Sequence, residues 1–263
     1  LADEDSALTK LMKYRFSEGN LSGVALGNLM LAALTRMEGD FSKAVSAMGK
    51  LVGARGKVLP VTNASTHICA ELLGGKKVEG EWDIIKKSNS RIKKLYLKDH
   101  VKPAKGVLES LRKADMIIIS PGSLRTGIIP ILLVDGVKEA IKKSKAKKVY
   151  CCNIMTHPGQ TDNFTVSMHV EEIKNYCGYR FDYVLVNSGK PSKDLMKAYE
   201  KDGAELVKID PLKEETTVIL DNFVADVDHT QLLRASGKGI MEFPHLIRHD
   251  SKKVGKILME LVK

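Results

Sequence analysis

The stretch DMIIISPGSLRTG, residues 115–127, decides the fold together with VYCCNIMTHPGQTD, residues 149–162. Each begins with a short apolar run and then breaks into a polar loop that contains Pro and Gly. Between them, apolar residues recur at close to helical spacing over residues 128–141. This pattern predicts two parallel strands joined by a helical crossover. Ligands of parallel sheets bind beyond the carboxyl ends of the strands, so we expect loops 120–127 and 153–162 to line one cleft.

The rest of the chain extends this pattern in both directions. Amphipathic stripes predict N-terminal helices over 8–16, 26–37 and 41–52. Alternating residues predict short strands over 57–62, 66–72, 76–82 and 91–97, with a turn at Gly74 and Gly75. Further strands are expected at 183–186, 205–209 and 216–220, before a terminal helix capped by Asp250.

These elements predict an α/β fold: a doubly wound, mostly parallel Rossmann-like sheet with helices on both faces and a small antiparallel β extension. We expect one domain over residues 1–263, with a β-rich insertion at 55–100.

Composition indicates a cytoplasmic protein without a membrane segment. The chain has 263 residues, of which 43% are hydrophobic, and no apolar run approaches the ~20 residues of a membrane helix. It opens with acidic residues rather than a basic signal region. Its four cysteines are too few for a disulfide framework, and neighbouring Cys151 and Cys152 should point to opposite faces of a strand. No His, Cys or acidic spacing predicts a metal site, and no nucleophile–base arrangement predicts catalysis.

The net charge of +10 has two interpretations. One is a nucleic-acid surface; the other is a set of lysines on solvated helix faces. Aromatic residues are only 5% of the chain and do not alternate with the basic ones, so no stacking platform is expected. We therefore predict no nucleic-acid partner.

The two polar loops have the chemistry of a nucleotide site. Loop 120–127 combines glycines, hydroxyls and Arg125 just before a helix, which suits an oxyanion such as phosphate. Asn153 and Thr156 in the second loop suit a uracil edge, a ribose or a sugar. The alternatives are an ordinary strand-to-helix turn with a Ser or Thr cap, and a turn made by Asn and Pro.

Several segments together resemble the gluconeogenesis factor family (YvcK type), of the 2-phospho-lactate transferase (CofD-like) superfamily. The similar segments span most of the chain: LGNL and LAAL at 26–34, VLPVT at 58–62, PGSL with Thr126, the 153–162 loop, and RHD at 248–250. The sequence departs from the family at Arg125, Gly127, His157 and Gln160. It also lacks the family's N-terminal strand with a Gly-Gly-Gly-Thr-Gly loop, so we expect the first βα unit to be absent.

The resemblance implies a regulatory factor that binds a UDP-sugar or related nucleotide and links carbon metabolism to envelope synthesis and cell shape. It places Gly122, Ser123 and Leu124 at the diphosphate, assisted by Arg125 and Thr126. Asn153 and Thr156 would contact the nucleoside or sugar, with Asn28 and Arg248 reaching in. The alternative is a transferase of the 2-phospho-lactate type, which moves a phospholactyl group from a nucleotide diphosphate carrier. No cofactor is implied beyond Mg²⁺ accompanying the nucleotide, and a homodimer is among the assemblies allowed.

The charge interpretation has a direct test. Because we assign the excess lysines to solvated faces, we expect only weak, unsaturable binding to single- or double-stranded nucleic acid at physiological salt. A true site with six or more phosphate contacts would lose roughly 10³-fold or more in affinity between 50 and 200 mM salt. Titration by fluorescence anisotropy at both salt concentrations measures this. Tight binding that persists at 150 mM salt would show the interpretation to be wrong.

Overall fold

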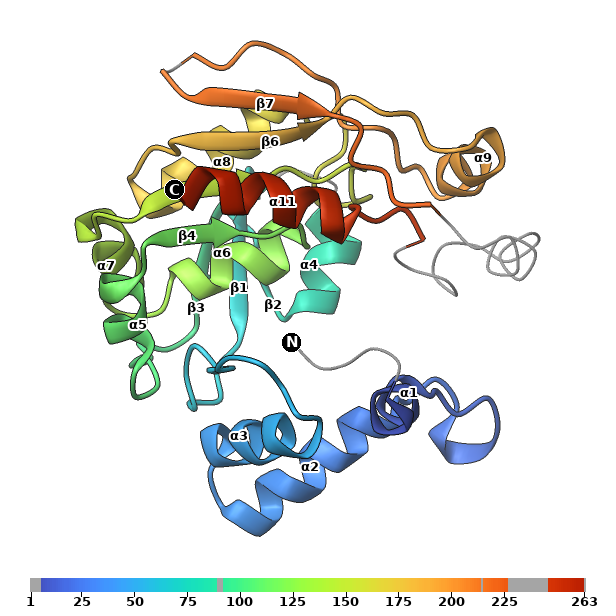
Figure 1. The fold of residues 1–263 in the computed structure, drawn as a ribbon, viewed down its shortest axis with the longest axis vertical. Coiled ribbons are helices and arrows are strands. Elements are labelled where there is room, and N and C mark those ends of the chain that lie inside the picture. The colour runs from blue at the N-terminus through green and yellow to red at the C-terminus, as the bar shows by residue number, and fades with distance from the viewer. Residues whose placement is uncertain (1–5, 89–91, 214, 227–245, 263) are drawn as a thin grey trace. The chain divides into compact units, whose positions relative to one another are not determined.

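The computed structural model describes residues 6–88, 92–213, 215–226 and 246–262. The chain forms two compact units (Figure 1). The first comprises Leu1–Ser65 and Val101–Glu109, and the second comprises Thr66–His100 and Ser110–Lys263. The expectation of a single domain over 1–263 stays a prediction.

The first unit is helical, as predicted. Its helices are α1 (Ala7–Lys13), the short 3₁₀ helix η1 (Gly19–Leu21), α2 (Leu26–Glu38) and α3 (Phe41–Leu51). Asp40 caps α3 by accepting a hydrogen bond from the N–H of Lys43 at 2.8 Å. Helices α1 and α2 cross closely at Gly27, where an added Cβ would lie 2.9 Å from the carbonyl oxygen of Met12.

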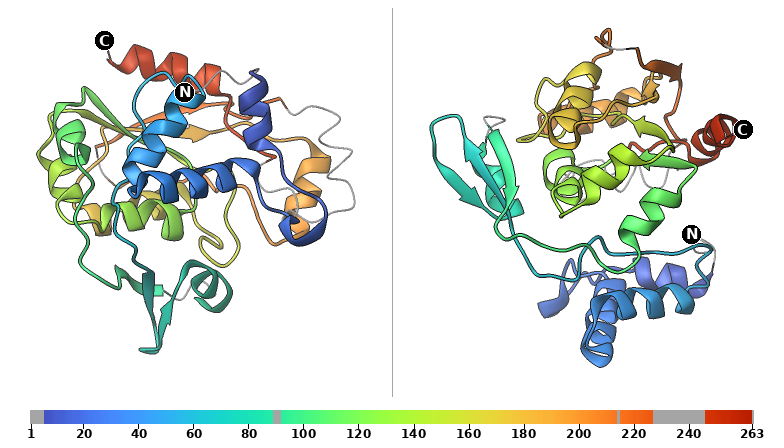
Figure 2. Two further views of the ribbon diagram at one scale, coloured as in Figure 1. Left: turned by 90° about the horizontal axis from the view of Figure 1, so that it is seen from below. Right: turned by 90° about the vertical axis from the view of Figure 1, so that its left-hand side faces the viewer.

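The second unit contains a small antiparallel sheet (Figure 2). Its strands β1 (Ile68–Leu72), β2 (Lys77–Glu79) and β3 (Ile92–Leu97) have the order β2-β1-β3. The predicted glycine turn is present, with Gly75 at a φ of 79°. Ala70, Val78 and Leu95 are buried on one face, so the sheet has its own apolar contacts.

Two strand predictions in this region were wrong. Residues 57–62 form no strand, because Pro60 has no N–H and Val61 makes only a single backbone bond, accepting from Ala104. The predicted strand 76–82 ends at Glu79. Gly80 has a φ of 91°, and its carbonyl accepts the first bond of helix α4 (Glu81–Ser88).

The centre of the second unit is a parallel sheet, as predicted. Strands β4 (Met116–Ile119), β5 (Lys147–Cys151), β6 (Tyr183–Asn187) and β7 (Thr217–Asp221) are hydrogen-bonded in chain order. Residues 205–209, predicted as a strand, contribute only isolated bridges that join Met155 to Leu206 and Thr165 to Lys208. These residues lie beside the loop after β5 and not beside a strand of the sheet, so they form no continuous row of strand hydrogen bonds.

Helices cover both faces of the parallel sheet (Figures 1 and 2). They include α6 (Ile129–Leu132), α7 (Val137–Lys143), α8 (Val166–Cys177) and α11 (Ser251–Val262). Helix α9 (Lys193–Lys201) instead packs on the loop after β5 through Leu195 and Tyr199, and α5 (Val107–Lys113) is shared between the two units. Val149, Cys151 and Leu185 pack against α11, while Tyr150, the residue between two of them, stacks on Phe181 at 5.5 Å. The α/β fold class is thereby confirmed, with the small antiparallel sheet as its extension.

The cysteines are core residues. All four are buried and free. Burial raises the pKa of Cys151 to about 11 and that of Cys152 to about 12, so both stay protonated at neutral pH.

The crossover between β4 and β5 is not one helix. Residues 124–128 form a π-type turn, η2 (Leu124–Ile128), and α6 follows it directly. Gly136, at a φ of 78°, then separates α6 from α7. Apolar spacing predicted a continuous helix here because it does not register a break in the backbone. Within the described residues, no helix is both long and apolar enough to span a bilayer.

A single hydroxyl joins the antiparallel sheet to α8. Tyr176 accepts a hydrogen bond from the N–H of buried Leu95 at 2.8 Å. We expect Tyr176→Phe to lower the free energy of unfolding by about 1–3 kcal/mol, since the buried N–H loses its partner. Urea unfolding measures this, with Tyr183→Phe as the control, because no partner of the Tyr183 hydroxyl lies in the described part of the chain. Equal stability of the two variants would contradict the assignment.

Candidate functional site at the carboxyl edge of the sheet

The two polar loops meet, as predicted, at the carboxyl ends of β4 and β5. The side chain of Asn153 donates to the carbonyl oxygen of Gly122 at 2.9 Å and accepts from its N–H at 3.2 Å. One amide side chain therefore holds both backbone polar groups of Gly122 in the neighbouring loop. This bidentate contact fixes the loop after β4 relative to the loop after β5.

A second amide makes the same connection deeper inside. Gln160 is fully buried, and its Oε1 accepts from the N–H of Arg125 at 3.2 Å and from the hydroxyl of Thr126 at 3.4 Å. Its Nε2 lies 2.5 Å from Nδ1 of His157. The sequence placed Gln160 in the loop but not in this role. A buried amide with both ends occupied resists displacement of either loop.

The start of η2 brings together two backbone N–H groups, that of half-buried Ser123 and that of Leu124, which is fully buried. Gly127 and Ile128 both donate to the carbonyl oxygen of Ser123, at 2.8 and 2.9 Å. In the described part of the chain, no acceptor is present for the N–H groups of Ser123 and Leu124. Consecutive unpaired N–H groups at a strand-to-helix junction bind oxyanions well. The N–H of Gly122, expected to join them, is instead used by Asn153.

Arg125, which the sequence places in an exposed loop, is buried. Its side chain is only 4% exposed, with Nε 3.0 Å from Oε1 of Glu172 and the guanidinium stacked over Phe164 at 5.1 Å. A buried cation needs a partner, and Glu172 on α8 supplies it. Arg125 therefore anchors η2 to α8 through this ion pair, and its predicted assistance at a diphosphate stays a prediction.

Thr156 is also occupied by the fold. Its N–H donates to the carbonyl oxygen of Glu205 at 2.7 Å, and its hydroxyl accepts from the N–H of Glu205 at 2.9 Å. The side chain is 5% exposed. Thr156 thus attaches residues 205–209 to the loop after β5, and its predicted contact with a nucleoside or sugar stays a prediction.

The start of α11 lies at the same edge, as predicted. Asp250 caps the helix, accepting from the N–H groups of Lys252 and Lys253. Nε2 of His249 lies 3.1 Å from the carbonyl oxygen of Cys152, the residue before Asn153. Arg248 is exposed and its carbonyl oxygen accepts from Ala225. The apolar side of α11 packs on the sheet, which fixes this end of the helix.

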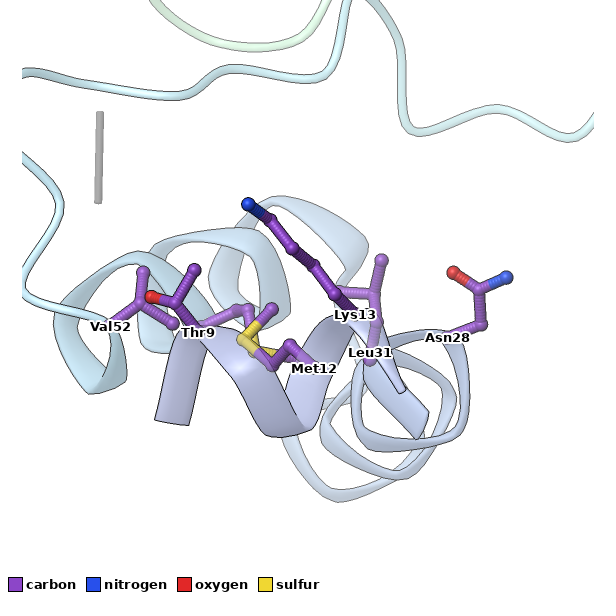
Figure 3. Close-up of a pocket in the computed structure, with 8 residues that line it drawn as sticks. Thr9, Met12, Lys13, Asn28, Leu31 and Val52 are labelled. Carbon is purple, nitrogen blue, oxygen red and sulfur yellow. The ribbon is translucent and has the colours of Figure 1, made fainter. Parts of the chain in front are cut away.

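Asn28 belongs to the first unit and lines a cavity there (Figure 3). The cavity has a volume of about 320 Å³ and lies between α1, α2 and α3, with Met12, Leu31, Met48 and Val52 forming its apolar walls. The predicted contact of Asn28 with the ligand stays a prediction.

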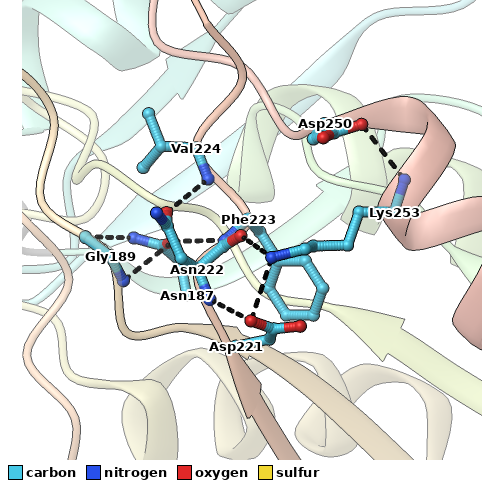
Figure 4. Close-up of polar contacts among 8 residues, drawn as sticks. All are labelled: Asn187, Gly189, Asp221, Asn222, Phe223, Val224, Asp250 and Lys253. Carbon is cyan, nitrogen blue, oxygen red and sulfur yellow. Dashed lines mark hydrogen bonds and ion pairs between the residues drawn. The ribbon is translucent and has the colours of Figure 1, made fainter.

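The sequence analysis missed the ends of β6 and β7. Asn187 and Asn222 follow these strands as Asn153 follows β5, and both hold neighbouring backbone (Figure 4). The sequence contained a pattern that could have predicted this. An Asn ends β6, and an Asn follows β5 and β7 within two residues.

These features define an α/β protein whose parallel sheet presents fixed polar loops at its carboxyl edge. A model of the CofD family, described as 2-phospho-L-lactate transferase CofD, matches residues 1–224. The chain belongs to this family.

Particular relatives are similar over nearly the whole chain. Gluconeogenesis factors of Halalkalibacterium halodurans and Bacillus subtilis are 41% and 39% identical, over 99% and 100% of this chain and 77% and 80% of theirs. A crystal structure of a UPF0052 family protein from Bacillus halodurans superposes with a TM-score of 0.84 at 38% identity, covering 98% of this chain and 79% of that one.

Two buried histidines make stability depend on pH. Burial lowers the pKa of His169 and of His249 below the ordinary 6.5. Both therefore bind a proton less readily in the folded protein than in the unfolded chain, where histidine titrates near pH 6.5. Stability is complete above that pH and falls as the pH decreases through it. The slope cannot exceed about 1.4 kcal/mol per pH unit for each histidine.

Urea unfolding between pH 7.5 and 5.5 measures this slope. His249→Asn should flatten it, whereas His100→Gln, at a side chain that is 99% exposed, should not. A slope unchanged by His249→Asn would contradict the assignment.

Proposed function

We propose that this protein binds a nucleotide sugar of the UDP-sugar class at the carboxyl edge of β4 and β5. As a cytoplasmic regulatory factor, it would link carbon metabolism to cell envelope synthesis and cell shape. The observation that carries the proposal is the N–H group of half-buried Ser123, which has no acceptor in the described part of the chain and lies beside the N–H of fully buried Leu124. The contact between Asn153 and Gly122 holds this loop in place. The similarity to gluconeogenesis factors supports the regulatory part.

Different residues would contact different parts of the ligand. The N–H groups of Ser123 and Leu124 take the diphosphate, and Thr126 supports them through Gln160. Asn153 is partly exposed and has used one N–H and one lone pair on Gly122, so one of each remains for a ribose or base. Arg248 provides a planar cation beside the same edge, which a lysine could not reproduce.

The second candidate is a transferase of the 2-phospho-lactate type, favoured by the family model that matches residues 1–224. Such chemistry uses a divalent metal on the diphosphate. Among the described residues, no group of three or more His, Cys, Asp or Glu side chains could hold a metal ion. Mg²⁺ would therefore be held through phosphate oxygens and water, a common mode for this ion.

Calorimetry with UDP-glucose, UDP-N-acetylglucosamine, GDP and GTP, with and without Mg²⁺, separates these candidates. The proposal expects saturable, one-site binding of the UDP-sugars without turnover. Hydrolysis or group transfer detected by phosphorus NMR during the titration would favour the transferase. Absence of UDP-sugar binding in every condition would refute the proposal.

Arg248 gives the proposal a residue-level test. We expect Arg248→Ala to weaken UDP-sugar binding by about 1.5–3 kcal/mol, the range for hydrogen bonds to charged groups, with little change in melting temperature. Arg180→Ala is the matched control, because Arg180 is an exposed arginine whose ion-pair partner in the described part of the chain is Glu215, at 4.0 Å. If Arg248→Ala binds like the parent, or unfolds, Arg248 has a structural role and leaves the site.

A further inference from the structure

The loop after β6 is a third fixed segment at the carboxyl edge of the sheet. Asn187 donates to the carbonyl oxygen of Gly189 at 2.7 Å and accepts from its N–H at 3.2 Å (Figure 4). The same oxygen accepts from the N–H of Phe223 at 2.9 Å. One side chain thus fixes the turn and ties it to the segment that follows β7.

Gly189 allows no side chain at this position. An added Cβ would lie 1.8 Å from Oδ1 of Asn222, which itself accepts from the N–H of Val224 at 3.1 Å. The N–H of Ser188 donates to the carbonyl oxygen of Asp221. The backbone of the turn is therefore set before any ligand arrives, which lowers the entropy cost of using it for binding.

Among the described residues, Lys190 is an exposed cation in this turn without an acceptor. Asp221 pairs with Lys253 at 3.0 Å, and Asp250 is occupied by the cap of α11. With the neighbouring carboxylates already used, Lys190 adds positive potential to this part of the edge.

The spacing of the strands sets what Lys190 can reach. Strands β4 and β6 are separated by β5, so their carboxyl ends lie about 9–10 Å apart. A ligand whose diphosphate lies on Ser123 and Leu124 would extend its sugar or its base over the turn after β6. Uracil and ribose are neutral, so a lysine gains an ion pair there only from an acidic sugar.

We propose that Lys190 is a specificity-determining residue that pairs with an anionic group on the sugar, so that the site prefers UDP-sugars bearing a carboxylate over neutral ones. The inference rests on the proposed function, since it assumes a nucleotide sugar with its diphosphate at Ser123 and Leu124.

The test compares two ligands that differ in charge, in variants that differ in charge at residue 190. UDP-glucuronate and UDP-glucose differ only in a carboxylate, and calorimetry gives the Kd of each for the parent, Lys190→Ala and Lys190→Glu. We expect the parent to prefer UDP-glucuronate by roughly tenfold or more, consistent with a charged hydrogen bond. Lys190→Ala should abolish that preference without changing UDP-glucose binding, and Lys190→Glu should reverse it.

Lys197→Ala is the control, because it removes the same charge from an exposed site on α9. Equal losses for both ligands would place Lys190 at the diphosphate, and no loss for either would place it outside the site; each result overturns the inference. If the parent binds UDP-glucose and Arg248→Ala weakens that binding, the proposed function stands whatever Lys190 does. A parent that binds neither ligand overturns both proposals.

Discussion

The candidate site depends on the bidentate contact between the Asn153 side chain and the peptide of Gly122. The last residues paired between β4 and β5 are Ile119 and Tyr150, and Gly122 and Asn153 each lie three residues further on. Beyond that pair the main chains diverge, so their N–H and C=O groups can no longer reach each other. A side-chain amide presents a donor and an acceptor side by side, as the N–H and C=O of one residue in an extended strand do. The Asn153 side chain thus connects the two loops beyond the last backbone pair of the strands. Ser123 and Leu124, whose N–H groups have no acceptor in the described part of the chain, follow Gly122 directly.

The same solution recurs along the edge. Asn187 bonds to its own turn and to Phe223, and Asn222 bonds to Val224. Parallel strands end in loops that must turn toward helices, which leaves backbone groups without ladder partners. Asparagine satisfies them at short range and, unlike a longer side chain, has little rotamer freedom to lose. The consequence for binding is that the loops are ordered in advance, so a ligand gains its contacts without the cost of fixing them.

The sequence pattern correctly predicted those elements that are stabilised by neighbouring residues in the chain, and those that are buried on both faces. The glycine turn at residues 74–75, the cap at Asp250 and the buried run at 149–151 are of this kind. Residues 205–209 were mispredicted because their alternation is typical of a strand, while a ladder also requires a neighbour along its length, and Thr156 supplies only one point of contact. Arg125 was assigned to the ligand because loop position suggests exposure. Its direction depends on the wide turn of η2 and on Glu172, which is 47 residues away in sequence.

The distribution of charge explains why a net charge of +10 does not by itself identify the ligand. Lys142, Lys143 and Lys145 are exposed near the end of α7, at the amino end of β5 and away from the loops. Their neighbours Lys147 and Lys148 donate to carbonyl oxygens of Leu261 and Ser144, where a cation favourably terminates a helix. Arg125 is neutralised by Glu172 inside the unit. At the carboxyl edge, the described cations include Lys190 and Arg248, which lie beside backbone held by hydrogen bonds. A few cations on rigid loops select a ligand by the position of its charges, whereas a lysine-rich helix surface with mobile side chains attracts anions without discrimination.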